Sequence, residues 1–423
     1  MPEKAVIFGA GNVGRGFLGQ LFAESGYEVV FVDIDEPLIT ALRSRRAYTI
    51  RLVDSDRQEE VRVGPVTGLL SRETEAVAEA LAEATLGATA VGARALPHVA
   101  PLVARGIALR ARRGVEAPLN LIICENLKGA AAIFRGMVLE QLHSLTPSPL
   151  PLGEGQPTKF PLPSGEGQGE GDPWQAYLAA HVGFVDTVIG RMVPELPPSL
   201  RAQDPSLIIV EPYKELPVDR AGFVGPIPQV VGMEPCDNFA LYTARKLYLH
   251  NAGHAVLAYL GYRRGLTFGY EALEDAEVRP ILDGALEEAL RGIVAQYGAD
   301  EGWLRQHVQD LKRRFANRAL ADPILRLARD PLRKLAPGDR LVGAARVAEA
   351  AGIVPLNLAW GIAGGLAFDA PDDPLAGQLQ GRIAQEGIEA TLAAVCAIQP
   401  AEPLGVAVLE RYHKLYEEPR WRR

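Results

Sequence analysis

The sequence predicts an α/β fold, with an N-terminal domain built on a parallel sheet and a C-terminal domain that is mostly α-helical. Up to about residue 125, short apolar runs alternate with helical patterns, whereas from Phe239 onward apolar residues recur mainly at spacings of three and four. In addition, a chain of 423 residues exceeds the length at which one hydrophobic core keeps growing, so two domains are expected.

The N-terminal strands are predicted from four apolar runs, at residues 5–8, 29–32, 87–91 and 119–124. Each run is short and is followed by turn or helix residues, and the first leads into a helical pattern at 13–25. Because strands that alternate with helices form crossover units, these runs are expected to lie parallel in one sheet.

Prolines near residues 195–199 predict the domain boundary, which gives an N-terminal domain at 1–195 and a helical substrate domain at 196–423. Within the first domain, residues 145–173 change abruptly to Pro, Gly, Glu and Gln and contain two near-duplicate pieces. Such a stretch has too little apolar surface to offset the entropy of ordering it. We therefore expect a disordered surface insertion, with a lid or partner-binding loop as the alternative.

A glycine-rich turn follows the first predicted strand and opens the first predicted helix. Gly9 allows the tight turn, Gly11 lets a pyrophosphate approach the backbone, and Gly14 lets helix and strand pack closely. The helix N-terminus offers free amide donors and a partial positive charge to phosphates. The predicted cofactor-binding residues here are Gly9, Ala10, Gly11, Asn12, Val13, Gly14 and Arg15. This order of elements predicts a Rossmann-type dinucleotide-binding domain.

Further cofactor contacts are predicted where the later strands end. Asp33 ends the second strand, where its carboxylate would accept hydrogen bonds from the adenosine ribose and repel a 2′-phosphate, so NAD is favoured over NADP. The carboxyl ends of parallel strands expose their residues to the cofactor crevice. On this ground the other predicted contacts are Thr89, Val91, Gly92 and Asn126.

A lysine, an amide and an imidazole lie close together in a predicted helix of the second domain, as Lys246, Asn251 and His254. On an α-helix they would lie at about 0°, 140° and 80°, within one arc. Oxidation of a secondary alcohol needs a base for the hydroxyl proton and donors that hold the oxygen. Taken alone, the helix favours a solvated lysine with two structural polar groups. A dinucleotide-binding domain upstream changes that preference to catalysis, with Lys246 as the base.

Two other chemistries fit the sequence less well. Tyr242 and Lys246 match the Y-x3-K pair of short-chain dehydrogenases, but that family uses one smaller domain and a differently spaced glycine turn. No metal site is predicted, because the three cysteines lie far apart and no histidines have metal-ligand spacing. The histidines outside the lysine helix are expected to be structural or solvated; they are His98, His143, His181, His307 and His413.

The net charge of the chain indicates which binding partners are expected. With 44 basic and 52 acidic residues the chain has no global positive field for nucleic acid or anionic lipid. No apolar stretch approaches the roughly 20 residues that span a bilayer, and the first residues show no signal-peptide pattern. These features predict a cytoplasmic protein with a small-molecule substrate and leave its oligomeric state open. An anionic substrate needs a local basic pocket, for which the candidates are Arg333, Lys334 and Arg340.

The spacing K-x4-N-x2-H, from Lys246 to His254, is typical of polyol-specific long-chain dehydrogenases. The chain resembles the mannitol dehydrogenase family along nearly its whole length, and within the family it is similar to the branch that acts on mannitol 1-phosphate. The segments that carry the resemblance lie at 8–17, 124–126, 181–186, 237–238, 246–254, 331–335 and 338–341.

The resemblance implies a Rossmann domain followed by a helical substrate domain, and reversible interconversion of D-mannitol 1-phosphate and D-fructose 6-phosphate with NAD. It implies that Lys246 is the acid/base and that Asn251 and His254 orient the substrate. Asp186 stands where mannitol 2-dehydrogenases use an asparagine near the reacting oxygen, and His250 replaces an apolar residue of the family. Two alternatives stay open: a dehydrogenase of an unphosphorylated polyol or hexuronate, and an NAD-binding sensor without catalysis.

Overall fold

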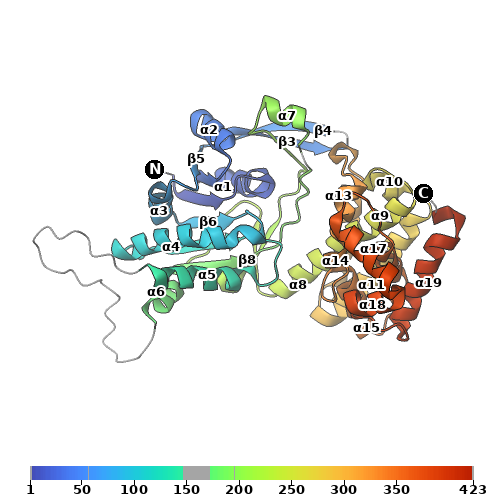
Figure 1. Cartoon of the computed structure of the whole chain (residues 1–423). Coiled ribbons are helices and arrows are strands. Elements are labelled where there is room, and N and C mark those ends of the chain that lie inside the picture. Colours follow the sequence, from blue (N-terminus) through green and yellow to red (C-terminus); the bar gives the residue numbers. More distant parts are fainter. Residues whose placement is uncertain (1, 56, 146–171, 195, 422–423) are drawn as a thin grey trace, which may run out of the picture. The chain divides into compact units, whose positions relative to one another are not determined.

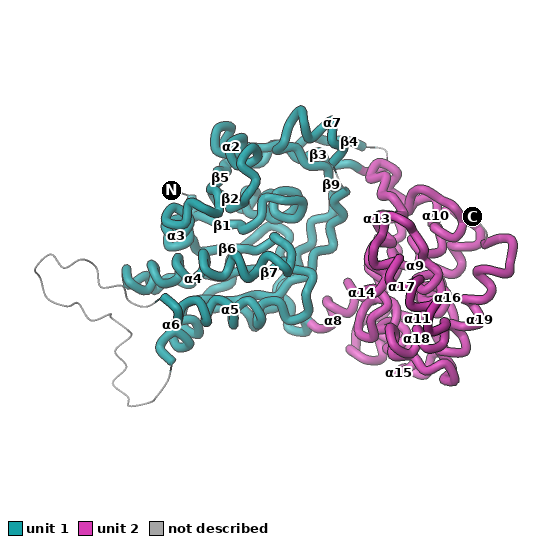
Figure 2. Tube along the Cα trace, in the orientation of Figure 1, with its two compact units in different colours: residues 1–53, 57–239 teal, residues 54–56, 240–423 magenta. Residues whose placement is uncertain are grey.

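The computed structural model describes residues 2–55, 57–145, 172–194 and 196–421 (Figure 1). The chain forms two compact units, which Figure 2 shows in separate colours. Unit 1 comprises residues 1–53 and 57–239, and unit 2 comprises residues 54–56 and 240–423. The insertion predicted at 145–173 lies outside the described residues, except at its ends, where Leu145 follows one helix and Asp172 caps the next.

Unit 1 is built on a six-stranded sheet in the order β5-β2-β1-β6-β7-β8, and every neighbouring pair of strands is parallel. The strands are β1 (Lys4–Phe8), β2 (Glu28–Asp33), β5 (Val66–Leu70), β6 (Leu86–Thr89), β7 (Leu119–Ile123) and β8 (Val182–Asp186). This confirms the predicted parallel sheet. The chain builds outward from β1 to β5 and then continues on the other side of β1, so a crevice for ligands is expected where β1 and β6 end.

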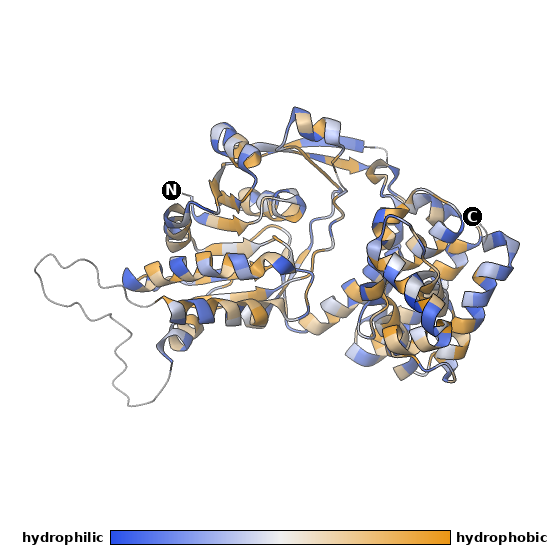
Figure 3. Cartoon of the chain, viewed as in Figure 1, coloured by the Kyte–Doolittle hydropathy of each residue, from blue (hydrophilic) through white to orange (hydrophobic). Residues whose placement is uncertain are grey.

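The strands are apolar at most of their positions, including the middle of β1 and β2, because both faces of the sheet are covered. In β1, Ala5 and Ile7 belong to the core on one face, whereas Val6 and Phe8 belong to the core on the other. Figure 3 shows these strands in the colour of hydrophobic residues. The first core includes η1 (Gly14–Leu18), α1 (Gly19–Glu24) and α2 (Glu36–Arg45); the second includes α3 (Thr74–Glu83), α4 (Leu96–Arg112), α5 (Ala130–Ser144) and α6 (Pro173–His181).

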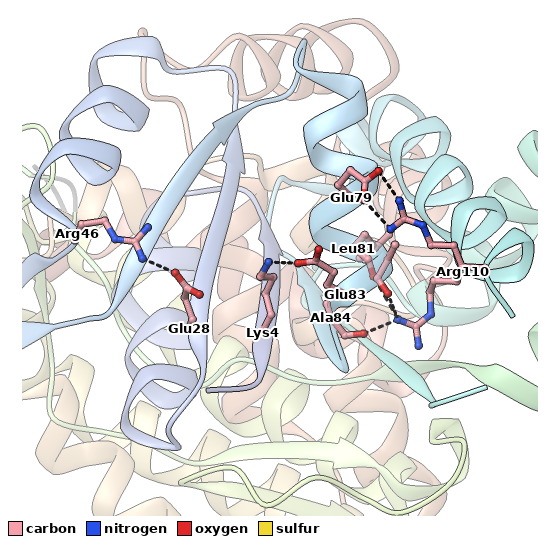
Figure 4. A network of polar contacts seen from close by, with 10 residues as sticks. Lys4, Glu28, Arg46, Glu79, Leu81, Glu83, Ala84 and Arg110 are labelled. Atoms are coloured by element: carbon pink, nitrogen blue, oxygen red, sulfur yellow. Dashed lines mark hydrogen bonds and ion pairs between the residues drawn. The ribbon is translucent and has the colours of Figure 1, made fainter. Parts of the chain in front are cut away.

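A buried guanidinium ties two helices to the sheet at the end opposite the crevice (Figure 4). Arg110 of α4 is 1% exposed, and its Nη1 donates hydrogen bonds to the carbonyl oxygens of Ala82 at 2.9 Å and Ala84 at 2.7 Å. Ala82 lies in the last turn of α3 and Ala84 caps that helix, so neither carbonyl has an acceptor role within the helix. Burial lowers the pKa of Arg110, so the carbonyls offset a real desolvation cost. Nearby, Lys4 forms an ion pair with Glu83.

The first unit extends beyond the boundary at 195 that the prolines suggested. Ile208, Val210, Leu216 and Val218 are almost fully buried in the same core as β1, so the segment up to residue 239 packs with the sheet. Its elements are α7 (Pro198–Gln203), β9 (Ile208–Val210), β10 (Leu216–Asp219), η3 (Arg220–Gly222) and β11 (Met233–Cys236). A second sheet, β4-β3-β9, was not predicted; it contains β3 (Tyr48–Asp54) and β4 (Arg57–Val63).

Arg191 holds this segment onto the first helix. Its guanidinium is 5% exposed and donates to the Glu211 carbonyl oxygen at 2.6 Å, the Gly16 carbonyl oxygen at 3.1 Å and Gln20 Oε1 at 2.7 Å. Because Gly16 and Gln20 belong to the helix that follows the glycine turn, Arg191 fixes the cofactor-binding region against residues 208–211.

Unit 2 is helical, as predicted, and is organised around α9 (Ala252–Arg263). Every residue of α9 except His254 is buried, which is typical of a helix that is enclosed on all sides. The other helices are α8 (Phe239–Ala244), η4 (Arg245–Asn251), α10 (Gly269–Glu274), α11 (Val278–Tyr297), α12 (Glu301–Phe315), η5 (Arg318–Leu320), α13 (Ile324–Ala328), α14 (Pro331–Lys334), α15 (Arg340–Ala350), α16 (Leu356–Leu366), α17 (Pro374–Glu386), α18 (Ile388–Cys396), α19 (Pro403–Glu417) and η6 (Pro419–Trp421). Within the described parts of the chain, no helix is long and apolar enough to span a membrane.

Candidate functional site

The glycine turn in unit 1 combines two closely packed glycines with one that faces open space. Gly9 has φ +98°, and a Cβ there would meet the carbonyl oxygen of Ala90 at 2.4 Å. A Cβ on Gly14 would meet the carbonyl oxygen of Gly9 at 1.9 Å, so the turn and the helix could not pack this closely with any other residue. A Cβ on Gly11 would meet nothing within 4 Å. The backbone at Gly11 is therefore accessible to a ligand.

The helix after the turn begins with a π-helical turn, η1. The amide of Gly19 donates to the carbonyl oxygen of Gly14, five residues back, and α1 continues from there. Gly11 and Asn12 are exposed at the start of this helix, and Val13 is partly buried. A helix N-terminus with exposed amides is suited to anions such as phosphate groups.

Asp33 lies beside the glycine turn at the end of β2. Its Oδ2 accepts a hydrogen bond from the amide of Ala10 at 2.6 Å, and its Oδ1 accepts from the amides of Ile34 at 2.7 Å and Asp35 at 3.1 Å. Three backbone donors thus hold the carboxylate next to the turn, in the place where an adenosine ribose is expected.

Arg15 lies inside the protein. Its side chain is 4% exposed and donates to the carbonyl oxygens of Ala10 and Ser206, and burial lowers its pKa. This geometry gives Arg15 a structural task, since it joins the glycine turn to the segment before β9. A contact with pyrophosphate stays a prediction.

Glu125 organises the other side of the crevice and was not among the predicted site residues. Its Oε1 accepts a hydrogen bond from the amide of Val91 at 3.0 Å. Burial raises the pKa of Glu125, and hydrogen bonds from the backbone of residues 91 and 92 oppose that rise. Thr89 is buried at the end of β6, Gly92 has φ +87° with open space around it, and Asn126 is exposed. The signal in the sequence was an acidic residue just after the mostly apolar strand predicted at 119–124.

Asp186 ends β8, at the same edge of the sheet. Its Oδ1 accepts a hydrogen bond from the amide of Ala131, at the N-terminus of α5, at 2.9 Å. Burial raises the pKa of Asp186. The structure thus gathers the ends of β1, β2, β6, β7 and β8, with the residues predicted there, at one edge of one sheet.

The lysine helix of unit 2 differs from the α-helix that the sequence suggested. Residues Arg245–Asn251 form a π-helical turn, η4, in which the amide of Ala252 donates to the carbonyl oxygen of Leu247, five residues back. Because hydrogen bonds in a π-helix join residues five apart, Lys246 and Asn251 lie one turn apart on the same face. The predicted separation of about 140° was therefore wrong, and the two residues are better aligned than an α-helix would make them.

Two histidines pack against Phe315 beside this turn. The His254 ring stacks on Phe315 with centroids 4.0 Å apart, and the His250 ring meets His254 edge-on at 4.9 Å. Burial lowers the pKa of both imidazoles well below the ordinary value, and the charge of Lys246 lowers it further. Both rings are neutral at physiological pH, so each has one donor and one acceptor nitrogen.

The predicted phosphate-binding cations differ in their surroundings. Lys334 is 5% exposed, and burial, followed by the charges of Arg340 and Arg333, lowers its pKa to about 7. Its Nζ donates to the carbonyl oxygen of Leu327 and lies 5.9 Å from the ring of Tyr259, a residue of α9. Arg333 forms an ion pair with Asp330 at 2.9 Å, and Arg340 forms one with Asp339 at 2.6 Å. The structure thus places Lys334 against α9, the helix that also contains His254, whereas each arginine has an acidic partner.

Two family models match the chain. The "Mannitol dehydrogenase Rossmann domain" matches residues 3–232, and the "Mannitol dehydrogenase C-terminal domain" matches residues 238–402. The chain belongs to the mannitol dehydrogenase family. The resemblance drawn from the sequence is confirmed at this level, and the two matched regions meet where the first compact unit ends.

Curated members of the family are similar over the full length. The mannitol-1-phosphate 5-dehydrogenases of Bacillus velezensis and Bacillus subtilis are 36% and 35% identical over 97% of this chain and 100% of their own. That of Brevibacillus brevis is 36% identical over 98% of each chain.

Solved structures of two other polyol dehydrogenases show the same fold. The Pseudomonas fluorescens mannitol 2-dehydrogenase, solved with NAD and D-mannitol, matches with a TM-score of 0.71 and 19% identity, covering 99% of this chain and 93% of that one. A D-sorbitol dehydrogenase matches with a TM-score of 0.77 and 18% identity, covering 99% and 94%. At these identities the likeness shows the fold alone.

Proposed function

We propose that this member of the mannitol dehydrogenase family is an NAD-dependent oxidoreductase that interconverts D-mannitol 1-phosphate and D-fructose 6-phosphate. The observation that carries the proposal is the π-turn that aligns Lys246 with Asn251. Beside it lies a neutral His254, and the charged side chains that act on its ring are all lysines and arginines. A neutral hydrogen-bonding group among cations suits a substrate that has both hydroxyls and an anionic group. The names of the full-length relatives support the phosphorylated substrate.

The residues at the glycine turn fit NAD. Gly11 leaves the backbone open for a pyrophosphate, and the carboxylate of Asp33 is held in place to accept hydrogen bonds from ribose hydroxyls. The same carboxylate would repel a 2′-phosphate, which argues against NADP. When bound, NAD supplies the acceptor for the hydride. Thr89, Val91, Gly92 and Asn126 are the further proposed contacts, with the loop at Val91 fixed by Glu125.

Lys246 is the proposed general base. Oxidation of the alcohol breaks the O–H bond and the adjacent C–H bond and forms a carbonyl, so one proton and one hydride must leave. In its neutral form Lys246 accepts the hydroxyl proton at Nζ, and in the reverse reaction the ammonium returns it. The Asn251 amide and the neutral His254 ring hold the reacting oxygen by hydrogen bonds. Asp186 is proposed as a further substrate contact.

Recognition of the phosphoryl group is assigned to the basic residues of 333–340. Lys334 is the foremost candidate because it lies against α9, the helix that contains His254, and an anion beside it would favour its charged form. Arg333 and Arg340 contribute positive potential around it, and the ion pair of each with an aspartate reduces that contribution.

A substrate panel followed by NADH absorbance tests the function. D-mannitol 1-phosphate, D-mannitol, sorbitol 6-phosphate and hexuronates are compared at equal concentrations, with NAD and with NADP. We expect the kcat/KM for D-mannitol 1-phosphate to exceed that for D-mannitol by at least about 100-fold, the effect of two lost charge-assisted contacts. Equal activity on D-mannitol 1-phosphate and D-mannitol would contradict the phosphorylated substrate and favour an unphosphorylated polyol. If none of the compounds were turned over, the remaining alternative would be an NAD-binding sensor without catalysis.

A further inference from the structure

Helix α12 lines the lysine helix along its length, because aromatic contacts fix it at two points. Near its start, the Trp303 ring lies 4.6 Å from the guanidinium carbon of Arg245 and 5.4 Å from the Tyr242 ring. At its end, Phe315 stacks on His254 at 4.0 Å. The face of α12 between these points is therefore turned toward residues 245–254.

His307 lies on that face. It follows Trp303 by four residues and precedes Leu311 by four and Phe315 by eight, and residues four apart share one side of an α-helix. Leu311 is fully buried, which confirms the direction of this face. The charges that act on the His307 ring are those of Arg245, Arg314 and Lys246. His307 thus lies on the face of α12 that is turned toward the lysine helix, and it is largely buried and not solvated.

The His307 ring has an unused polar atom. Its Nε2 is buried and has no hydrogen-bond partner among the described residues. A buried nitrogen left in this way costs about 1–3 kcal/mol, and native proteins rarely keep one without a ligand or water to satisfy it. The pKa of His307 is lowered to about 3 by burial and the neighbouring cations, so the ring carries no charge. A neutral imidazole has one donor and one acceptor nitrogen and matches a hydroxyl, which donates and accepts, better than it matches a phosphoryl group.

We propose that His307 contacts the substrate through Nε2, forming a hydrogen bond with one hydroxyl of the polyol chain, and so determines how the chain is placed relative to Lys246. The inference rests on the proposed function and adds to it a residue that recognises the carbon chain. Under this proposal the site recognises two parts of the substrate in different ways. Cations attract the phosphoryl group, and the neutral His307 ring forms a hydrogen bond with one hydroxyl. A longer or shorter chain, or one with the opposite configuration at that carbon, would lose this contact.

The first experiment compares His307→Phe and His307→Gln in the full-length enzyme, with His413→Gln as the matched control because His413 is exposed on α19. We expect His307→Phe to lower kcat/KM for D-fructose 6-phosphate by about 10- to 100-fold, and His307→Gln, whose amide can take the place of Nε2, to restore part of it. The unfolding temperature of His307→Phe should be equal to or higher than that of the wild type, because an unsatisfied buried nitrogen is removed. A lower unfolding temperature with unchanged kinetics would make His307 structural and overturn the proposal.

The second experiment identifies the hydroxyl. Wild type and His307→Phe are each assayed with D-fructose 6-phosphate analogues that lack one hydroxyl, at C1, C3, C4 or C5. One analogue should lose activity with the wild type but lose little further with the variant, because both changes remove the same hydrogen bond. Additive losses for every analogue would overturn the proposal, because Nε2 would then contact none of these hydroxyls.

The outcomes separate this inference from the function on which it rests. If the wild type does not reduce D-fructose 6-phosphate, the proposed function fails and the inference with it. If the wild type is active and His307→Phe matches it in every assay, only the assignment of His307 fails.

Discussion

Each unit contains a π-helical turn beside its predicted site, and the two turns arise in different ways. In unit 1, η1 follows a turn in which Gly9 and Gly14 pack so closely that no side chain would fit. In unit 2, η4 contains no glycine, and its side chains are held by the surrounding helices, as when Arg245 lies over the rings of Tyr242 and Trp303. The geometry of η1 is therefore determined by a few residues that lie close together in the sequence, whereas that of η4 depends on packing between residues far apart in the chain.

The difference has an energetic meaning. A π-turn has poorer hydrogen-bond geometry than an α-turn and persists where other interactions fix it, frequently at functional sites. In η4 those interactions include the burial of Leu249 and His250, each nearly complete. The alignment of Lys246 with Asn251 is thus a property of the folded unit and not of the peptide.

Removing the base should give the largest effect. We expect Lys246→Ala to lower kcat by about 10²- to 10⁴-fold while NADH binding, measured by fluorescence titration, stays near that of the wild type. Lys246→Arg keeps the positive charge but cannot accept the proton, so it should be as inactive as the alanine variant. Near wild-type turnover in either variant would show that the lysine helix has a structural role only.

The glycines of unit 1 should separate stability from binding. Gly14→Ala places a methyl group against the Gly9 carbonyl and should lower the free energy of unfolding by on the order of 2 kcal/mol or more. Gly11→Ala meets no protein atom within 4 Å, so it should unfold at the wild-type temperature but bind NADH at least about tenfold more weakly. Calorimetry and NADH titration on both variants decide the matter, and unchanged NADH affinity in Gly11→Ala would contradict the placement of the pyrophosphate.

Asp33 should control the choice between NAD and NADP. Asp33→Ser removes the charge that opposes a 2′-phosphate and should raise the ratio of kcat/KM for NADP to that for NAD by about tenfold. Asp35→Ser removes an equal charge two residues away, and serine can still cap α2, so it should leave the ratio unchanged. A wild-type enzyme that uses both cofactors equally well would refute the role given to Asp33.

The smallest expected effect is the pH dependence of phosphate recognition. Because the pKa of Lys334 is lowered to about 7, its ammonium is charged below that pH and neutral above it. An anion binds better to the charged form, so KM for D-mannitol 1-phosphate should rise several-fold between about pH 6 and about pH 8. Lys334→Arg stays charged and should flatten this rise. An equal rise in both proteins would show that another group is titrating.

The features that the sequence revealed depend on neighbours along the chain. The parallel strands follow from apolar runs, and the glycine turn follows from the close spacing of Gly9, Gly11 and Gly14. The resemblance to the family was detectable because its motifs, such as the one from Lys246 to His254, are also local.

The features that were missed depend on contacts between distant residues. The π-turn at η4 was treated as an α-helix because nothing within the segment distinguishes the two. The sequence did not reveal which way His307 faces, because the contacts of Trp303 and Phe315 that orient its face of α12 join residues far apart in the chain. A histidine and an arginine on the otherwise apolar face of a strongly charged helix were the available signal, at His307 and Arg314.

The hydrogen bonds of Arg191 limit where the chain can be cut to give a fragment that folds by itself. The six strands end at Asp186, yet the helix behind the glycine turn is held by a guanidinium whose third partner is the carbonyl of Glu211. A fragment that stops at residue 195 would keep every strand of the sheet but expose the core that Ile208 and Leu216 cover. The cofactor-binding half is therefore an autonomous folding module only if it continues to residue 239, and a chimera between family members should be joined there.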